Sequence, residues 1–276
     1  MAIRWERDNG AGGSVADGTS GGTPGKRMVV GTNISSVRFD DVVAAIDRPP
    51  RGRAQVMSFC NVHSVMTAHR QASLAEVLNA SDVAAPDGMP IVWWMRMIHG
   101  VAQTRVDGPS VMDLTLRAGM DRGWRHYLYG TTPATLQQLC DRLAVTHPDA
   151  TIVGAYAPPF RPLTPAEEAE VVECIRSAEP TVVWVGLGMP KQEMWMHEMR
   201  ARLPGMTLMG VGAAFDMLAG HTPRAPVWMR NSGLEWVYRL FSEPRRLWRR
   251  YAANNPAYLV LLAREMLMRQ RRSASA

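Results

Sequence analysis

The feature that most constrains the fold of this 276-residue chain is a regular alternation of short apolar strand patterns with helical patterns. Strands are predicted at residues 28–31, 55–59, 82–85, 126–129, 151–156, 182–185 and 206–211. Between them, helices are predicted at residues 39–47, 63–70, 74–80, 91–98, 110–120, 133–143, 165–177 and 191–203. This alternation predicts a Rossmann-like α/β fold, with a largely parallel sheet flanked by helices.

Composition divides the chain into three parts. Residues 1–26 are rich in Gly, Ser, Thr and Ala and have little to bury, so we expect a disordered leader. Residues 27–229 hold the alternating pattern and form the expected α/β core. From Arg230 onward, ten arginines stand against three glutamates, a net charge of +7, whereas the whole chain carries +6. The basic excess therefore belongs to residues 230–276, and a partner attracted by it meets that end.

The basic segment has the composition of amphipathic helices. We predict helix over residues 233–251, broken at Pro244, and a final apolar stretch over residues 257–268 that Pro256 opens. Trp and Tyr interleaved with arginines suit a lipid headgroup interface, so a membrane-associating appendage is expected. The alternative is a helix packed on the core with its arginines in solvent. Neither a signal peptide nor an apolar run of roughly 18 to 20 residues is recognised.

The stretch 182–193 (VVWVGLGMPKQE) is a buried-strand pattern that breaks at Gly186 and Gly188 and runs into Gln192 and Glu193. In an open parallel sheet, loops at the carboxyl ends of strands form the ligand crevice. These residues are therefore predicted to bind substrate. A turn that needs Gly for backbone reasons only is the alternative interpretation.

Polar residues follow other predicted strands as well. Asp87 stands in a Pro-Asp-Gly turn and is a candidate general base, although Asp before Gly is often only a turn former. Asn61 and His63 follow the predicted strand 55–59 just as Asp87 follows the strand 82–85, and either could orient a substrate hydroxyl. Asp216 follows a run of small residues and could accept a hydrogen bond from a ribose or sugar hydroxyl, unless those small residues serve helix packing alone.

Arginines supply the remaining candidates. Arg105 begins a loop that also holds Asp107 and precedes Asp113, and its local sequence favours a solvated connection with an internal ion pair. In the appendage, guanidinium groups suit a diphosphate because their fork of donors matches phosphate oxygens. These arginines are Arg239, Arg245, Arg246, Arg249 and Arg250.

Several function classes are disfavoured. No Asp-x-Asp motif or Walker lysine loop is present, so no metal and no cofactor are expected, and a leaving diphosphate must be neutralised by arginines and backbone N–H groups. Cys60, Cys140 and Cys174 are widely spaced, which predicts reduced thiols and a cytoplasmic setting. A nicotinamide-dependent oxidoreductase is disfavoured because the sequence has no strand followed by a Gly-x-Gly-x-x-Gly turn. No nucleic-acid-binding module is recognised either. A nucleotide-binding regulatory or scaffold protein recruited to the membrane by the basic tail stays open.

Taken together, the motifs of residues 28–258 resemble the WecG/TagA/CpsF family of bacterial glycosyltransferases. The matching segments are NVHSVM (61–66), PDG (86–88), RVDGPSVM (105–112), VGLGMPKQE (185–193), GVGAAFDMLAG (210–220), RAP (224–226) and LEWVYRLFSEPRRLWRR (234–250). Several long motifs in one order make the resemblance specific.

The resemblance implies an inverting, metal-independent transfer of a sugar from a UDP-sugar to a polyprenyl-diphosphate-linked saccharide. It also implies a peripheral enzyme on the cytoplasmic face of the plasma membrane that builds wall polymer or exopolysaccharide. Asp87 matches the general base. Substrate-binding roles are expected for Asn61, His63, Arg105, Gly186, Gly188, Gln192, Glu193, Asp216, Arg239, Arg246 and Arg249, the last three on a mobile appendage that closes over the diphosphate.

Two positions depart from the family pattern. Phe59 stands where the family commonly has a catalytic Thr, so either Ser58 substitutes through a register change or the hydroxyl is dispensed with. Ser110 stands where an aspartate is frequent, and Asp113 is the candidate replacement. The apolar face of residues 91–98 is a candidate surface for homo-oligomer formation.

Overall fold

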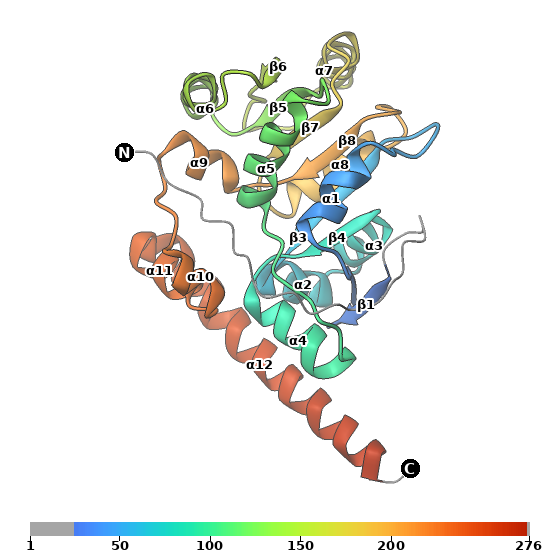
Figure 1. The fold of residues 1–276 in the computed structure, drawn as a ribbon, viewed down its shortest axis with the longest axis vertical. Helices are drawn as coiled ribbons and strands as arrows, with labels where there is room; N and C mark the ends of the chain where they lie inside the picture. The colour runs from blue at the N-terminus through green and yellow to red at the C-terminus, as the bar shows by residue number, and fades with distance from the viewer. Residues whose placement is uncertain (1–24, 275–276) are drawn as a thin grey trace.

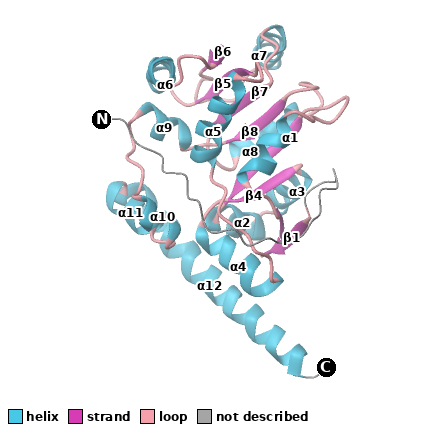
Figure 2. Ribbon diagram, viewed as in Figure 1, coloured by secondary structure: helices cyan, strands magenta, loops and turns pink. Residues whose placement is uncertain are grey.

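The computed structural model describes residues 25–274 and confirms the α/β prediction. Six strands form a parallel sheet in the order β4-β3-β8-β7-β5-β6, and helices flank it (Figures 1 and 2). An antiparallel pair, β1 and β2, packs beside β4. The strands are β1 Lys26–Val29, β2 Thr32–Ser35, β3 Gln55–Cys60, β4 Val83–Pro86, β5 Arg125–Gly130, β6 Thr151–Tyr156, β7 Val182–Gly186 and β8 Thr207–Gly210.

The helices alternate with the sheet strands as predicted up to β8, and several then follow in succession. Those before β6 are α1 Phe39–Ile46, α2 Val62–Arg70, α3 Ala72–Ala80, α4 Met89–His99, α5 Gly108–Met120 and α6 Pro133–Thr146. Those after it are α7 Pro165–Ser177, α8 Lys191–Met199, α9 Ala214–Ala219, α10 Val227–Asn231, α11 Glu235–Ser242 and α12 Pro244–Ala274.

Side-chain alternation along the central strand β7 explains why the sheet is covered on both faces. Val182 and Trp184 are buried in one apolar cluster with side chains of α1, α5, α6 and α9. Val183 and Val185 belong to a second cluster with side chains of α7 and α8. Because successive strand residues point to opposite faces, an all-apolar strand such as this one must be covered twice.

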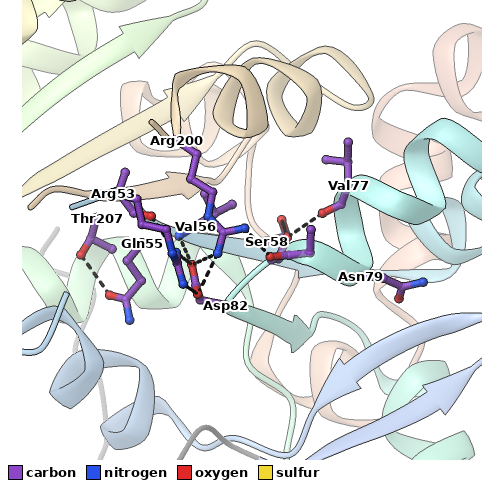
Figure 3. Close-up of polar contacts among 12 residues, drawn as sticks. Arg53, Gln55, Val56, Ser58, Val77, Asn79, Asp82, Arg200 and Thr207 are labelled. Carbon is purple, nitrogen blue, oxygen red and sulfur yellow. Dashed lines mark hydrogen bonds and ion pairs between the residues drawn. The ribbon is translucent and has the colours of Figure 1, made fainter. Parts of the chain in front are cut away.

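An ion-pair cluster lies at the amino ends of β3 and β4 (Figure 3). The carboxylate of Asp82 accepts two hydrogen bonds from Arg53, at 2.7 and 2.9 Å, one from the Val56 N–H and further ones from Arg200. Burial alone would raise the pKa of Asp82, but these donors outweigh it and lower the pKa. The cluster joins the starts of β3 and β4 to the end of α8.

The C-terminal region differs from the prediction at Pro256. The break at Pro244 is confirmed, since α11 ends just before it, but α12 continues through Pro256 instead of restarting there. Pro256 and Ala252 are both exposed, so water can reach the carbonyl that the missing proline N–H leaves unpaired. Tyr258 and Leu262, just beyond, are buried against side chains of α2 and α4 and hold the helix on the core.

Other differences are small. The strand β2 and the short helices α9 and α10 were not predicted, because each spans only four to six residues. Residues 1–24 of the predicted leader lie outside the described residues, and Lys26 already belongs to β1. In the segment 91–98, the candidate for self-association, Ile91, Val92, Trp94 and Met95 are buried within the chain, with Trp94 packed against Tyr258 of α12 at a ring-centroid distance of 5.7 Å, whereas Met97 is exposed.

Candidate active site

A cavity of about 430 Å³ lies at the carboxyl ends of β3, β4, β7 and β8. Each of these strands leads into residues that line it. Asn61 and His63 follow β3, and Asp87 follows β4. Gly188, Met189, Gln192 and Glu193 follow β7, and residues 210–214 lie at and just after the end of β8. Strand order places these four strands side by side, although they are far apart in sequence. The position is the one at which open α/β sheets bind ligands.

The C-terminal segment forms the remaining wall of this cavity. It contributes aromatic, amide and cationic side chains, including Trp236 and Arg239 from α11 and Arg246, Tyr251 and Asn254 from α12. The helix α12 packs against α2 and α4, the helices that follow β3 and β4, and extends along the outside of the molecule (Figure 1). The cavity is therefore completed by residues that follow the sheet in sequence.

Asp87 lies in this cavity with an unpaired carboxylate. Its backbone N–H donates to the Cys60 carbonyl at 2.9 Å, and Gly88 takes φ +110° to start α4. No group within residues 25–274 donates a hydrogen bond to the carboxylate. Burial, with the charges of Asp107 and Glu235, raises the pKa of Asp87 to about 7, although Arg105 and Arg239 oppose the rise. A carboxylate with such a pKa suits a general base at neutral pH.

Arg105 belongs to a buried ion-pair network whose charges act on Asp87. It pairs with Asp107 at 2.9 Å and with Glu235 of α11. Asp107 also accepts from Arg224, which donates to the Ser110 hydroxyl at 2.6 Å. The internal ion pair predicted for this loop is thus confirmed, but the solvated connection is wrong, because both partners are buried. Arg105 itself does not line the cavity, but its partners Asp107 and Glu235 do.

Gln192 and Glu193 present unpaired polar atoms at the cavity. Gln192 Nε2 donates to Glu193 Oε1 at 2.8 Å and to the Gly210 carbonyl at 3.1 Å. Gln192 Oε1 and Glu193 Oε2 are buried and have no hydrogen-bond partner among the described residues. Buried polar atoms are normally paired, and a ligand hydroxyl both donates and accepts. A hydroxyl-rich ligand would therefore satisfy both atoms.

Replacing Glu193 by Gln is expected to flatten the pH dependence of stability. Burial raises the pKa of Glu193 to about 7, although a hydrogen bond from Gln192 opposes the rise. The folded protein therefore binds more protons than the unfolded chain between about pH 4.5 and pH 7, and stability falls as pH rises through that window. The Glu193→Gln variant lacks this loss of unfolding free energy, which is roughly 3 kcal/mol at most.

Urea denaturation at about pH 5 and about pH 7.5 measures this difference. Glu198→Gln, an exposed change on the same helix, is the control and should keep the wild-type dependence. A Glu193→Gln protein whose unfolding free energy falls as steeply as that of the wild type would contradict the expectation.

Arg239 and Arg246 reach the cavity and share one acidic partner. The Arg239 Nη2 atom lies 3.7 Å from Glu243 Oε1, and Arg246 is in close contact with Glu243 Oε2. Arg250 lines the cavity beside them. Three guanidinium groups at one wall provide a site for a polyanion such as a diphosphate.

Four of the predicted substrate-binding residues lie apart from the cavity lining: Arg105, as described above, and Arg249, Asp216 and Gly186. Arg249 is exposed, and its guanidinium carbon lies 5.3 Å from the Trp248 ring centroid. Asp216 lies on α9, where Ala214 and Met217 line the cavity but Asp216 does not. Gly186 ends β7 beneath the ring of Phe215, so its backbone is needed for packing.

Gly186→Ala is expected to destabilise the fold by about 1–3 kcal/mol. A Cβ atom there would lie 2.5 Å from Phe215 Cδ2, closer than any contact the packed ring can accept. Thermal unfolding measures the loss. Because the clash is with one ring, adding Phe215→Leu should recover part of it, and strictly additive losses would contradict this explanation.

The structure also locates the positions that depart from the family pattern. Phe59 lines the cavity as an apolar wall. The Ser58 hydroxyl is buried and lies 3.0 Å from the Ser81 hydroxyl, so it does not replace the missing threonine in the cavity. Asp113 pairs with Arg117 and His147 and does not compensate for Ser110.

Sequence reasoning missed the cavity residues that belong to helical faces. Trp93, Trp236, Tyr251 and Asn254 line the cavity, yet each sits in a pattern that reads as an ordinary amphipathic helix. Glu235 was missed for the same reason. Only Trp93 carries a signal in the sequence, since its helix follows a predicted strand end; the others lie on α11 and α12, which do not follow a strand.

Comparison with known proteins gives a consistent result. A family model described as "Glycosyl transferase WecG/TagA/CpsF family" matches residues 27–272. A relative in Bacillus subtilis (strain 168), named N-acetylglucosaminyldiphosphoundecaprenol N-acetyl-beta-D-mannosaminyltransferase, is 30% identical over 210 residues. That alignment covers 76% of this chain and 79% of the relative.

Proposed function

This chain belongs to the WecG/TagA/CpsF family of glycosyltransferases, and from that premise we propose that it transfers a sugar from a UDP-sugar to a polyprenyl-diphosphate-linked saccharide. The reaction inverts the anomeric centre, needs no metal, and serves surface polysaccharide synthesis. The observation that carries the proposal is the composite cavity. It combines an unpaired Asp87 carboxylate, buried and unpaired polar atoms of Gln192 and Glu193, and arginines of the C-terminal segment.

Asp87 takes the proton of the acceptor hydroxyl in this reaction. The hydroxyl oxygen attacks C1 of the donor sugar on the face opposite the leaving UDP, so the bond to C1 forms as the bond to the diphosphate breaks. A pKa of about 7 means that a large fraction of Asp87 is ionised at neutral pH while it remains basic enough to accept a proton.

The arginines of the cavity wall stabilise the leaving diphosphate. Arg239 and Arg246 provide positive charge and parallel donors, and the partly enclosed cavity strengthens their interaction with the developing charge. The absence of an Asp-x-Asp motif in the sequence supports a metal-independent site. Gln192 and Glu193 hold the donor sugar through its hydroxyls. Four predicted binding residues are left without a direct contact in this proposal: Arg105, Gly186, Asp216 and Arg249.

The acceptor is expected to reach the cavity from the inner face of the plasma membrane. The C-terminal segment exposes Phe241, Trp248, Leu259 and Leu267 among its arginines, a combination suited to the lipid headgroup region. No described helix has both the length and the apolar character needed to cross a bilayer. The segment would then complete the active site at the same time as it binds the membrane.

Incubation with a panel of UDP-sugars, with and without a polyprenyl-diphosphate-linked N-acetylglucosamine, tests the proposal. UDP-N-acetylmannosamine heads the panel because the Bacillus relative is named as an N-acetylmannosaminyltransferase. Acceptor-dependent UDP release with a lipid-linked disaccharide product is the expected result. Binding of a nucleotide with no product from any donor would instead favour the regulatory or scaffold alternative.

A further inference from the structure

The helix α12 contacts the cavity residue His63 through the buried side-chain amide of Asn254. Asn254 of α12 is 3% exposed and sits between two side chains of α2. Arg70 Nη2 donates to Asn254 Oδ1 at 2.6 Å, and Asn254 Nδ2 lies 3.1 Å from His63 Nδ1. The three side chains form one chain of hydrogen bonds that links residues 191 positions apart in the sequence.

The direction of these hydrogen bonds follows from their chemistry. A guanidinium group has only donors, so the Asn254 atom that faces Arg70 must be the carbonyl oxygen. The amide nitrogen then faces His63, and because it can only donate, His63 Nδ1 must accept. A neutral imidazole that accepts at Nδ1 carries its proton on Nε2.

His63 is held neutral by its surroundings. Burial, reinforced by the positive charges of Arg250 on α12 and Arg70 on α2, lowers the pKa of His63 to about 4. The hydroxyl of Thr67, one turn along α2, lies 3.3 Å from Nδ1 and can also donate to it. Asn254 and Thr67 therefore both face Nδ1 of His63. The other ring nitrogen, Nε2, has no hydrogen-bond partner among the described residues, and His63 lines the cavity.

We propose that Asn254 is a positioning residue that fixes His63 as the Nε2–H tautomer and thereby supplies the cavity with a neutral hydrogen-bond donor. The ligand group that receives this bond is an oxygen of the sugar diphosphate or of the acceptor sugar, so the inference rests on the proposed function. The C-terminal helix thus packs on the core and also determines which ring nitrogen of His63 carries the proton.

Nitrogen-15 NMR of histidine-labelled full-length protein tests the tautomer directly, with His63→Gln used to assign the signal. The wild type is expected to show protonated Nε2 and unprotonated Nδ1 at about pH 7. Asn254→Asp places a carboxylate, which only accepts, against Nδ1, so protonation of Nδ1 is expected there. Asn255→Asp makes the same charge change at the next position and should leave the tautomer unchanged.

A wild-type His63 that carries its proton on Nδ1, or is doubly protonated at this pH, overturns the proposal. So does an Asn254→Asp protein that keeps the wild-type tautomer. If Asn254→Asp does not fold, the wild-type spectrum alone still decides. This measurement needs no substrate, so its failure is distinguishable from failure of the proposed function, which shows as absence of product.

Steady-state kinetics distinguish a positioning role of Asn254 from a purely structural one. Loss of one neutral hydrogen bond to the ligand is expected to lower kcat/KM about 10-fold in Asn254→Asp. In a His63→Gln background, the Asn254→Asp change should lower kcat/KM by clearly less, because no tautomer remains to be set. Equal losses in the two backgrounds would show a structural role only and overturn the proposal.

Discussion

Asp87→Asn is expected to lower kcat by at least about 100-fold while leaving the dissociation constant for the UDP-sugar nearly unchanged. The amide has almost the shape of the carboxylate but cannot accept the proton of the acceptor hydroxyl. Because the carboxylate has no hydrogen-bond donor within residues 25–274, the change should leave no new unpaired partner behind. The loss should therefore fall on the chemical step and spare the fold.

The pH profile gives this prediction a second readout. The active form of the base is ionised, and burial raises the pKa of Asp87 to about 7, so wild-type kcat/KM should rise with pH and level off above that value. Asp87→Asn should lack this rise. Asp40→Asn, an exposed change on α1, is the control for the substitution itself. Wild-type turnover by Asp87→Asn would remove Asp87 from the mechanism.

The double variant Arg239→Ala/Arg246→Ala is expected to lower kcat about 100-fold or more. Removal of one preorganised donor from a developing anion costs about 100- to 1,000-fold in well-studied sites, and these arginines are partly exposed, which weakens each contribution. The loss should appear in kcat more than in KM, since the charge on the diphosphate grows as the bond to the sugar breaks.

A matched pair separates the cavity charge from the overall charge of the segment. Arg245→Ala/Arg264→Ala removes the same two charges from exposed positions that do not line the cavity. Both doubles should weaken association with anionic vesicles to a similar extent, but only the first should lower turnover with a soluble short-chain acceptor. Equal turnover losses in the two doubles would assign the arginines to membrane attraction alone.

Much of the fold could be predicted because its local patterns agree with its tertiary environment. Strands such as β7 are apolar on both faces, as a buried parallel strand must be, and Pro244 ends a helix as expected. Pro256 was misleading because the helix around it is held by Tyr258 and Leu262, whose burial outweighs the local preference for a break.

The site was predictable where it follows the ends of strands. Asp87 comes directly after β4, and Gln192 and Glu193 begin the helix that follows β7, so the strand-end rule predicts that they meet at one cavity. The contacts of Asn254 and Glu235 were not predictable, because each depends on how α11 and α12 pack on the core. The sequence of an amphipathic helix indicates which face is buried but not which distant residue that face meets.

The configuration of the product tests the account most directly. The full-length protein would be incubated with the productive UDP-sugar and the lipid-linked acceptor in excess EDTA, and the new glycosidic bond examined by NMR. A single displacement assisted by Asp87 and the arginines predicts product in the presence of EDTA, with the anomeric configuration opposite to that of the donor. Retention of the donor configuration, or product formation only when a divalent metal is restored, would contradict it.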